Sequence, residues 1–104
     1  MTVKHTFFCG LNDKDSKLQE VNTLDAARII TRVFMAHGTD CTISNARGVY
    51  THEDGTIVSE ETIMVQCYQF GDPIDVKGIC EDLKKMLNQE SIAVESTETN
   101  SALY

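Results

Sequence analysis

The feature that most constrains the fold is an Asp-Gly pair at Asp54 and Gly55, which lies between two runs rich in β-branched and apolar residues. Asp-Gly between such runs is the strongest short sequence signal for a β-hairpin. The second run alternates apolar and polar residues toward its end, as a half-buried strand does. We therefore predict two antiparallel strands, residues 41–50 and 56–70, joined by a turn at residues 52–55.

The segment before this hairpin predicts one strand and one helix. Residues 3–10 are short, aromatic-rich and end at a glycine, which is typical of a strand. Residues 24–37 carry apolar side chains near helical spacing, and either Asn22 or Thr23 can cap their start. Gly38 follows, and glycine readily adopts the left-handed conformation in which many helices end, so we expect the helix to end there.

The segment after the hairpin predicts a second helix and a last strand. Asp72 and Pro73 suit a helix N-cap and first turn, and apolar residues then recur at i, i+3, i+4 and i+7 through residues 76–87. Residues 91–97 alternate again and predict a strand. We expect residues 98–104 to form a polar C-terminal tail.

The resulting β-α-β-β-α-β order predicts an α+β fold of the ferredoxin-like type, with two helices on one face of a four-stranded antiparallel sheet. A chain of 104 residues is long enough for one core and too short for two ordinary domains, so we assign residues 1–97 to a single domain. The first and third strands should be central in such a sheet.

The sheet face away from the helices is the first candidate binding surface. An apolar patch there would be larger than monomers usually leave in water. We expect a second copy of the chain, a protein partner or a small ligand to cover it, unless the tail folds back through Leu103 and Tyr104. The side chains predicted to form this patch are Phe8, Met64, Tyr68 and Phe70.

Charge and cysteine usage exclude several classes of function. Nine Lys and Arg against sixteen Asp and Glu give a net charge of −7, and the basic residues are scattered, so nucleic-acid binding is not expected. The sequence has no apolar stretch near the roughly 20 residues that span a bilayer, and no secretion signal, which favours a cytoplasmic location. Four cysteines without a CxxC pair indicate reduced thiols, and no metal or cofactor is expected.

Four short motifs together resemble a family of small uncharacterised bacterial and phage-type domains. They are Phe8-Cys9-Gly10-Leu11, Gly48-Val49-Tyr50, Asp54-Gly55-Thr56-Ile57-Val58 and Asn88-Gln89-Glu90-Ser91-Ile92. The resemblance runs from about residue 4 to residue 94. It implies a ferredoxin-like domain, encoded by a phage or mobile element, and carries no assigned reaction and no catalytic residues.

The segment around Gln89, Glu90 and Ser91 is the second candidate binding site, because three polar side chains in a row can hydrogen-bond a ligand. The alternative is structural: Asn88 would cap the helix and Ser91 would open the last strand. We interpret the chain as a binding module without a catalytic constellation, most simply a homodimer.

The alternative function is a small dimeric ferredoxin-like enzyme with an acid/base site. Its proton-handling residues would be Tyr50, His52 or Glu90, and Glu60 and Glu61 lie in the same hairpin. Turn chemistry also explains the acidic residues at the tip of that hairpin, so both interpretations stay open.

Overall fold

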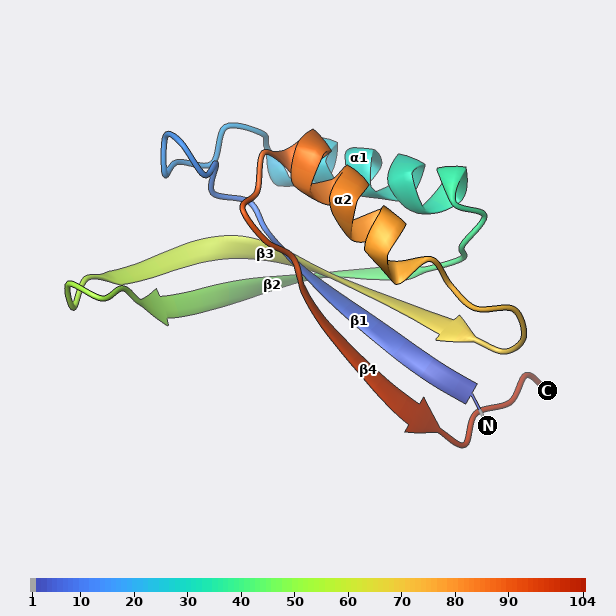
Figure 1. The fold of residues 1–104 in the computed structure, drawn as a ribbon. Coiled ribbons are helices and arrows are strands. Elements are labelled where there is room, and N and C mark those ends of the chain that lie inside the picture. The colour runs from blue at the N-terminus through green and yellow to red at the C-terminus, as the bar shows by residue number, and fades with distance from the viewer. Residues whose placement is uncertain (1) are drawn as a thin grey trace.

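The computed structural model describes residues 2–104 and shows one four-stranded antiparallel sheet with two α-helices (Figure 1). This confirms the predicted α+β, ferredoxin-like architecture and its β-α-β-β-α-β order. The elements are β1 (Thr2–Gly10), α1 (Thr23–Ala36), β2 (Thr42–Thr51), β3 (Ile57–Gln69), α2 (Val76–Leu87) and β4 (Ala93–Thr99).

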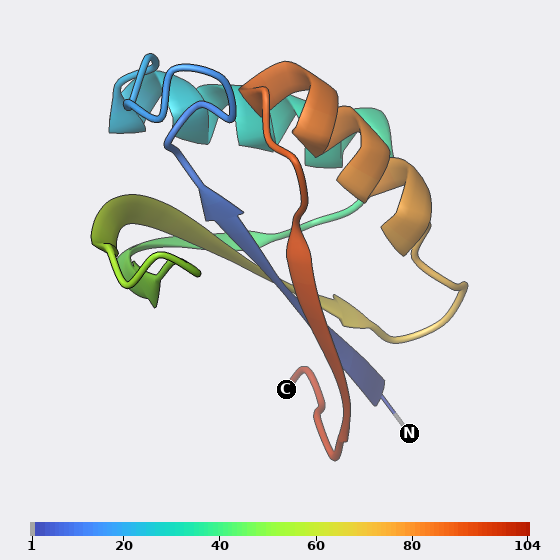
Figure 2. The same ribbon diagram turned by 60° about the vertical axis from the view of Figure 1, so that its left-hand side comes forward.

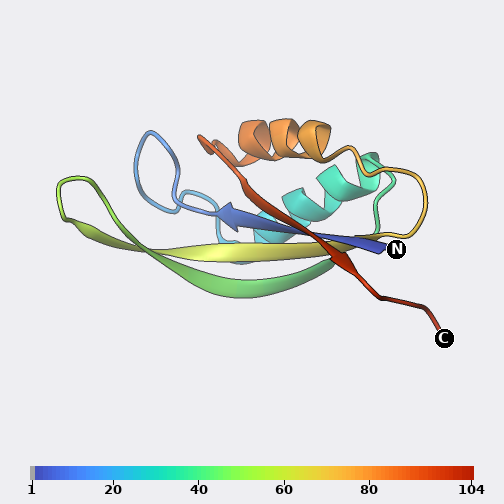
Figure 3. The ribbon, with the colours of Figure 1, turned by 60° about the horizontal axis from the view of Figure 1, so that its bottom comes forward.

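The strand order in the sheet is β2-β3-β1-β4, so β1 and β3 are central, as the sequence predicts. Both helices cover the same face of the sheet, which leaves the other face without a covering layer (Figures 2 and 3). Every pair of neighbouring strands is antiparallel.

The core lies between the helices and the alternate side chains of the two central strands. Phe7 pairs across the sheet with Val65 on β3 and with Val94 on β4. The Phe7 ring meets the Phe34 ring of α1 edge-on, with centroids 5.1 Å apart, a geometry that aromatic pairs favour. The remaining fully buried apolar side chains include Cys9, Ile30, Ile63, Cys67, Ile79 and Leu83.

The ends of α1 follow the expected capping chemistry. Asn22 is the N-cap, and its side-chain oxygen accepts a hydrogen bond from the Asp25 amide at 2.8 Å. Gly38 has a φ of +65°, a left-handed conformation that glycine adopts without strain.

The predicted start of α2 at Asp72 and Pro73 is wrong. The helix begins at Val76, and its N-cap is Asp75, whose carboxylate accepts from the Gly78 amide at 3.0 Å. The reason is a local contact: the Gln69 side chain, five residues earlier, accepts a hydrogen bond from the Ile74 amide at 2.9 Å and keeps this segment in a loop.

The β2–β3 hairpin is longer than the rest of the sheet and extends beyond the helices (Figure 1). Its turn closes as expected, because the His52 amide donates to the Thr56 carbonyl at 2.8 Å and Gly55 has a φ of +86°. Val49 and Ile57 near the tip are mostly exposed, since no helix covers this part of the sheet.

The last strand continues to Thr99, two residues beyond the expected Thr97, because Glu98 and Thr99 still pair with β1. Leu103 and Tyr104, in the tail that follows, are almost fully exposed and do not fold back on the sheet. Within residues 2–104, neither helix has the length and apolar character that a membrane crossing requires.

Candidate functional site

The predicted apolar patch lies on the uncovered face of the sheet. Phe8 and Met64 are cross-strand partners on β1 and β3, and both are partly buried. The Tyr68 and Phe70 rings stack with centroids 6.0 Å apart and are 44% and 52% exposed. The structure therefore brings these side chains to one face and leaves the two aromatic rings accessible.

Tyr50 and Glu60 lie on the same face, toward the outer end of the hairpin. Strand alternation places Glu60 on the uncovered side, because it shares the parity of Met64, while Ile63 faces the helices. Gly48 on β2 is the cross-strand partner of Glu60. The Tyr50 ring lies over Gly48, and a Cβ on that glycine would be 2.5 Å from the Tyr50 hydroxyl.

The Glu60 carboxylate is held in a defined position by the neighbouring strand. Its Oε2 accepts a hydrogen bond from the Asn12 backbone amide at 3.0 Å. Its Oε1 lies over Gly10, where a Cβ would be only 2.6 Å away. Two glycines thus leave room beside one half-buried carboxylate and one aromatic ring.

The adjacent Glu61 has a different environment. It points to the other side of β3 and forms an ion pair with Arg47 on β2, with 2.6 Å between Nη2 and Oε1. Its charge is therefore neutralised within the hairpin, whereas Glu60 accepts only a neutral backbone donor among its described contacts. Neighbouring residues of a strand face opposite sides of the sheet, so Glu60 and Glu61 lie on different faces although both belong to the hairpin.

His52 does not join this site. It lies in the turn, is exposed and contributes its backbone to turn closure. Glu90 and Ser91 are also exposed, at the entry to β4. Of the residues named for the enzyme interpretation, Tyr50 lies on the same face as Glu60, whereas His52 and Glu90 lie elsewhere. The contact of Glu60 with Asn12 joins segments 48 residues apart, and no local sequence signal shows it.

The side chains of Asn88 and Gln89 form hydrogen bonds with the loop that follows β1. Asn88 ends α2 in a left-handed conformation with a φ of 49°, and its amide donates to Asp13 at 2.8 Å and to Asp15 at 3.0 Å. The Asn88 hydrogen bond is the main cause that lowers the pKa of Asp13, followed by the backbone amides of Ser16 and Asp15. The structural interpretation of Asn88 therefore fits the observed contacts.

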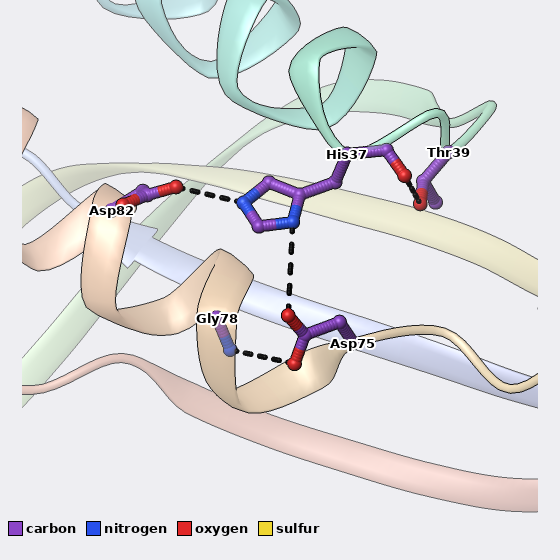
Figure 4. Close-up of polar contacts among 5 residues, drawn as sticks. All are labelled: His37, Thr39, Asp75, Gly78 and Asp82. Atoms are coloured by element: carbon purple, nitrogen blue, oxygen red, sulfur yellow. Dashed lines mark hydrogen bonds and ion pairs between the residues drawn. The ribbon is translucent and has the colours of Figure 1, made fainter.

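A histidine joins the two helices on the covered side of the molecule (Figure 4). His37, at the C-terminus of α1, has its Nε2 2.7 Å from Asp82 of α2, and its Nδ1 is 3.9 Å from Asp75. The His37 side chain is 20% exposed, so this contact is partly shielded from water. It links the C-terminal end of α1 with the first two turns of α2.

The cysteines are free, and their environment opposes nucleophilic chemistry. Burial raises the pKa of Cys9 to about 12 and that of Cys67 to about 11. The pKa values of Cys41 and Cys80 are raised as well, again mainly by burial. All four thiols are thus protonated at neutral pH, and a thiol is a much weaker nucleophile than a thiolate.

Neither of two surface hollows in the structure coincides with Tyr50 and Glu60. One of about 70 Å³ lies beside Leu11, Asp13 and Asn88, and one of about 230 Å³ lies between the two helices beside Arg32 and Lys85. Both are smaller than the roughly 300–1,000 Å³ of typical small-molecule sites. Among residues 2–104, no three His, Cys, Asp or Glu side chains gather closely enough to hold a metal ion.

Comparison with known proteins gives similarity in structure only. No family model matches the sequence, and no curated protein matches it, so the motif resemblance stays a prediction. A phage SAM lyase in complex with S-methyl-5'-thioadenosine is 23% identical, with a TM-score of 0.72 over 93% of this chain and 81% of that chain. The apo state of a phage SAM lyase gives 24% identity and a TM-score of 0.67, over 91% of this chain and 78% of that chain. The Bacillus subtilis GlnK–ATP complex is 14% identical, with a TM-score of 0.56 over 92% of this chain and 81% of that chain. At these identities the likeness establishes a shared fold.

Proposed function

We propose that the protein binds S-adenosylmethionine at Tyr50 and Glu60 and cleaves it as a lyase, releasing S-methyl-5'-thioadenosine. The observation that carries this proposal is that a half-buried carboxylate and an exposed aromatic ring lie on the same sheet face, in a fold that resembles a phage SAM lyase over 93% of the chain. The enzyme interpretation of the sequence is thereby preferred to the binding module, with Glu60 in place of His52 and Glu90.

The charge of the substrate explains why this pair suits it. S-adenosylmethionine carries a positively charged sulfonium, which a carboxylate attracts by about 1 kcal/mol in water at 4 Å and by about 4 kcal/mol near a protein surface. The face of an aromatic ring adds about 0.5–2 kcal/mol for a cation. Glu60 lacks the arginine partner that neutralises Glu61, so its charge is available to a ligand.

The reaction class follows from the products. Release of S-methyl-5'-thioadenosine breaks the bond between the sulfonium sulfur and the γ-carbon of the methionine chain, and the electron pair of that bond stays on sulfur. The positive charge next to Glu60 disappears in this step. A lyase adds no water, so the bond lost at the γ-carbon is replaced within the substrate. Either the carboxylate of the methionine chain attacks the γ-carbon and closes a lactone ring, or the β-carbon gives a proton to the Glu60 carboxylate and a double bond forms. Both products lack the water that hydrolysis adds, so their mass distinguishes them from the product of hydrolysis.

Isothermal titration calorimetry with two ligands tests the site. S-adenosylmethionine is charged at sulfur and S-methyl-5'-thioadenosine is neutral there, so Glu60→Gln should weaken binding of the first at least tenfold and of the second by less than threefold. Tyr50→Leu should weaken both. Glu61→Gln is the matched control on the same strand and should change neither. Equal losses in Glu60→Gln and Glu61→Gln, or no binding by the wild type, would contradict the proposal.

A second proposal concerns the apolar patch, because Tyr68 and Phe70 stack and are exposed. A second copy of the chain would cover these rings in a homodimer, as inferred from the sequence. A protein partner is the alternative occupant. The cytoplasmic location is part of the same proposal, and the likeness to a phage protein supports an origin in a phage or mobile element.

A further inference from the structure

We propose that Gln89 is a positioning residue for Glu60, acting through the backbone of Asn12. The inference rests on the proposed lyase site. It assigns control of the Glu60 orientation to a residue that does not lie on the uncovered sheet face. Gln89 lies just beyond the C-terminus of α2, on the covered side of the molecule, and Glu60 lies on the uncovered side of β3. Asn12, in the segment after β1, contacts both.

The connection consists of two short hydrogen bonds to one residue. Gln89 donates from Nε2 to the carbonyl oxygen of Asn12 at 2.7 Å. Asn12 donates from its backbone amide to Glu60 Oε2 at 3.0 Å. The Leu11 amide also donates to the Glu61 carbonyl at 3.0 Å, which keeps this segment beside β3. A shift of Asn12 therefore moves the donor that orients the Glu60 carboxylate.

Gln89 is itself well placed to act as an anchor. Its backbone amide donates to the Lys84 carbonyl at 2.9 Å, which completes the C-terminal cap of α2 after the left-handed Asn88. The side chain is partly buried and spans from the cap to Asn12. Asn88 holds Asp13 and Asp15 of the same loop, so Gln89 and Asn88 fix adjacent parts of one segment.

The consequence for the reaction concerns the rate more than binding. A carboxylate that accepts one directed hydrogen bond is restricted in orientation, and small displacements of a reacting group can cost large factors in rate. Loss of the Gln89 contact should not remove the charge of Glu60, so the carboxylate still attracts the sulfonium. The carboxylate is then no longer oriented, and the substrate is aligned less well for the reaction. The expected signature is a lower kcat with little change in KM.

The test compares Gln89→Met, which keeps the length of the side chain and removes its donor, with Gln19→Met. Gln19 is an exposed glutamine of the same loop that bonds locally to the Val21 carbonyl and the Thr23 hydroxyl. Kinetics with S-adenosylmethionine should show a roughly tenfold lower kcat and a less than twofold change in KM for Gln89→Met. Gln19→Met should match the wild type.

A second readout does not depend on turnover. In ¹⁵N NMR the Asn12 amide signal should change by a definite step between the wild type and Glu60→Gln, because this amide donates to the Glu60 carboxylate. The same comparison in a Gln89 variant measures how much of that contact persists. Gln89→Met should reduce the step by at least half, and Gln89→Glu, which places an acceptor against the Asn12 carbonyl, should do the same. An unchanged step in both Gln89 variants would overturn the positioning role. A reduced step in a protein that cleaves no S-adenosylmethionine would support the positioning of Glu60 and contradict the lyase proposal.

Discussion

Glu60 and Glu61 are neighbours in sequence with opposite environments, and strand geometry is the reason. Glu61 faces Arg47 and is neutralised, whereas Glu60 faces away from the helices and accepts the Asn12 amide. Alternation along residues 57–69 can be read from the sequence, so the side of the sheet on which each residue lies was predictable. The Asn12 contact was not, because it depends on how the loop after β1 packs against β3.

The space over Gly10 gives a prediction at the residue scale. Gly10→Ala would place a Cβ 2.6 Å from Glu60 Oε1, so the carboxylate must swing away from the Asn12 amide. We expect kcat to fall at least tenfold while the free energy of unfolding drops by about 1 kcal/mol or less, since the atom displaced is the end of a flexible side chain. Steady-state kinetics and urea unfolding measure the two effects.

Gly71→Ala is the control for that change. Nothing lies within 4 Å of a Cβ at Gly71, and its φ is not in the left-handed region. This variant should keep wild-type activity and stability. Full activity in Gly10→Ala would show that the position of the Glu60 carboxylate does not matter.

Burial of Cys9 predicts an alkaline loss of stability. Its pKa is raised from 9.0 to about 12 in the folded protein, so the unfolded chain loses this proton first. The stability is therefore complete below pH 9 and falls as the pH rises from 9 toward 12, by roughly 2 kcal/mol at pH 10.5 for this one thiol. Urea unfolding from pH 7 to 10.5 measures the slope.

Cys9→Ala serves as the comparison for the alkaline slope. It should be less stable than the wild type at pH 7, because a buried sulfur is lost, and its stability should decline less steeply above pH 9. Identical slopes in the two proteins would contradict the assignment of a buried, protonated thiol at this position.

At the scale of the elements, the helices and strands follow their sequence patterns, and the boundaries differ where a side-chain contact competes with a capping signal. Asn22 and Gly38 delimit α1 through local capping chemistry, which the sequence displays. Asp72 has the same local signal and does not cap α2, because Gln69 holds the Ile74 amide instead. Local signals therefore compete, and here a side-chain contact across five residues accompanies the shift of the N-cap from Asp72 to Asp75.

The contact between His37 and Asp82 predicts energetic coupling between α1 and α2. A double-mutant cycle with His37→Ala and Asp82→Asn should give a coupling of about 1 kcal/mol, modest because the Asp82 side chain is half exposed. Urea unfolding at pH 7 of the wild type, both single variants and the double variant measures it (Figure 4). A coupling near zero would mean that water screens the contact completely.

At the scale of the whole molecule, the β-α-β-β-α-β order was enough to predict that β1 and β3 are central and that the helices cover a single face. The same reasoning predicted that Phe8, Met64, Tyr68 and Phe70 would share the uncovered face. Strand parity places Phe8, Met64 and Tyr68 there, and Phe70, directly after β3, stacks on Tyr68. The hydrophobic pattern of the sequence does not identify the molecule that contacts this face, because an exposed apolar surface can bind a ligand, a partner protein or a second copy. A ligand or a second copy must therefore be sought by experiment.

The exposed pair Tyr68 and Phe70 predicts self-association. Light scattering after size exclusion should give a mass of at least two chains at micromolar concentration, and the double variant Tyr68→Ser/Phe70→Ser should shift it toward one chain of 11.6 kDa. A wild-type protein that stays monomeric at high micromolar concentration would contradict the proposed homodimer.

Chromatography coupled to mass spectrometry, applied to purified protein incubated with S-adenosylmethionine, tests the central claim most directly. The account predicts that the wild type and Glu61→Gln accumulate S-methyl-5'-thioadenosine with an unhydrated carbon product. It also predicts that Glu60→Gln forms it at least tenfold more slowly at a substrate concentration below KM, because the sulfonium is bound more weakly. Product formation by Glu60→Gln at the wild-type rate, or none above background by the wild type, would contradict it.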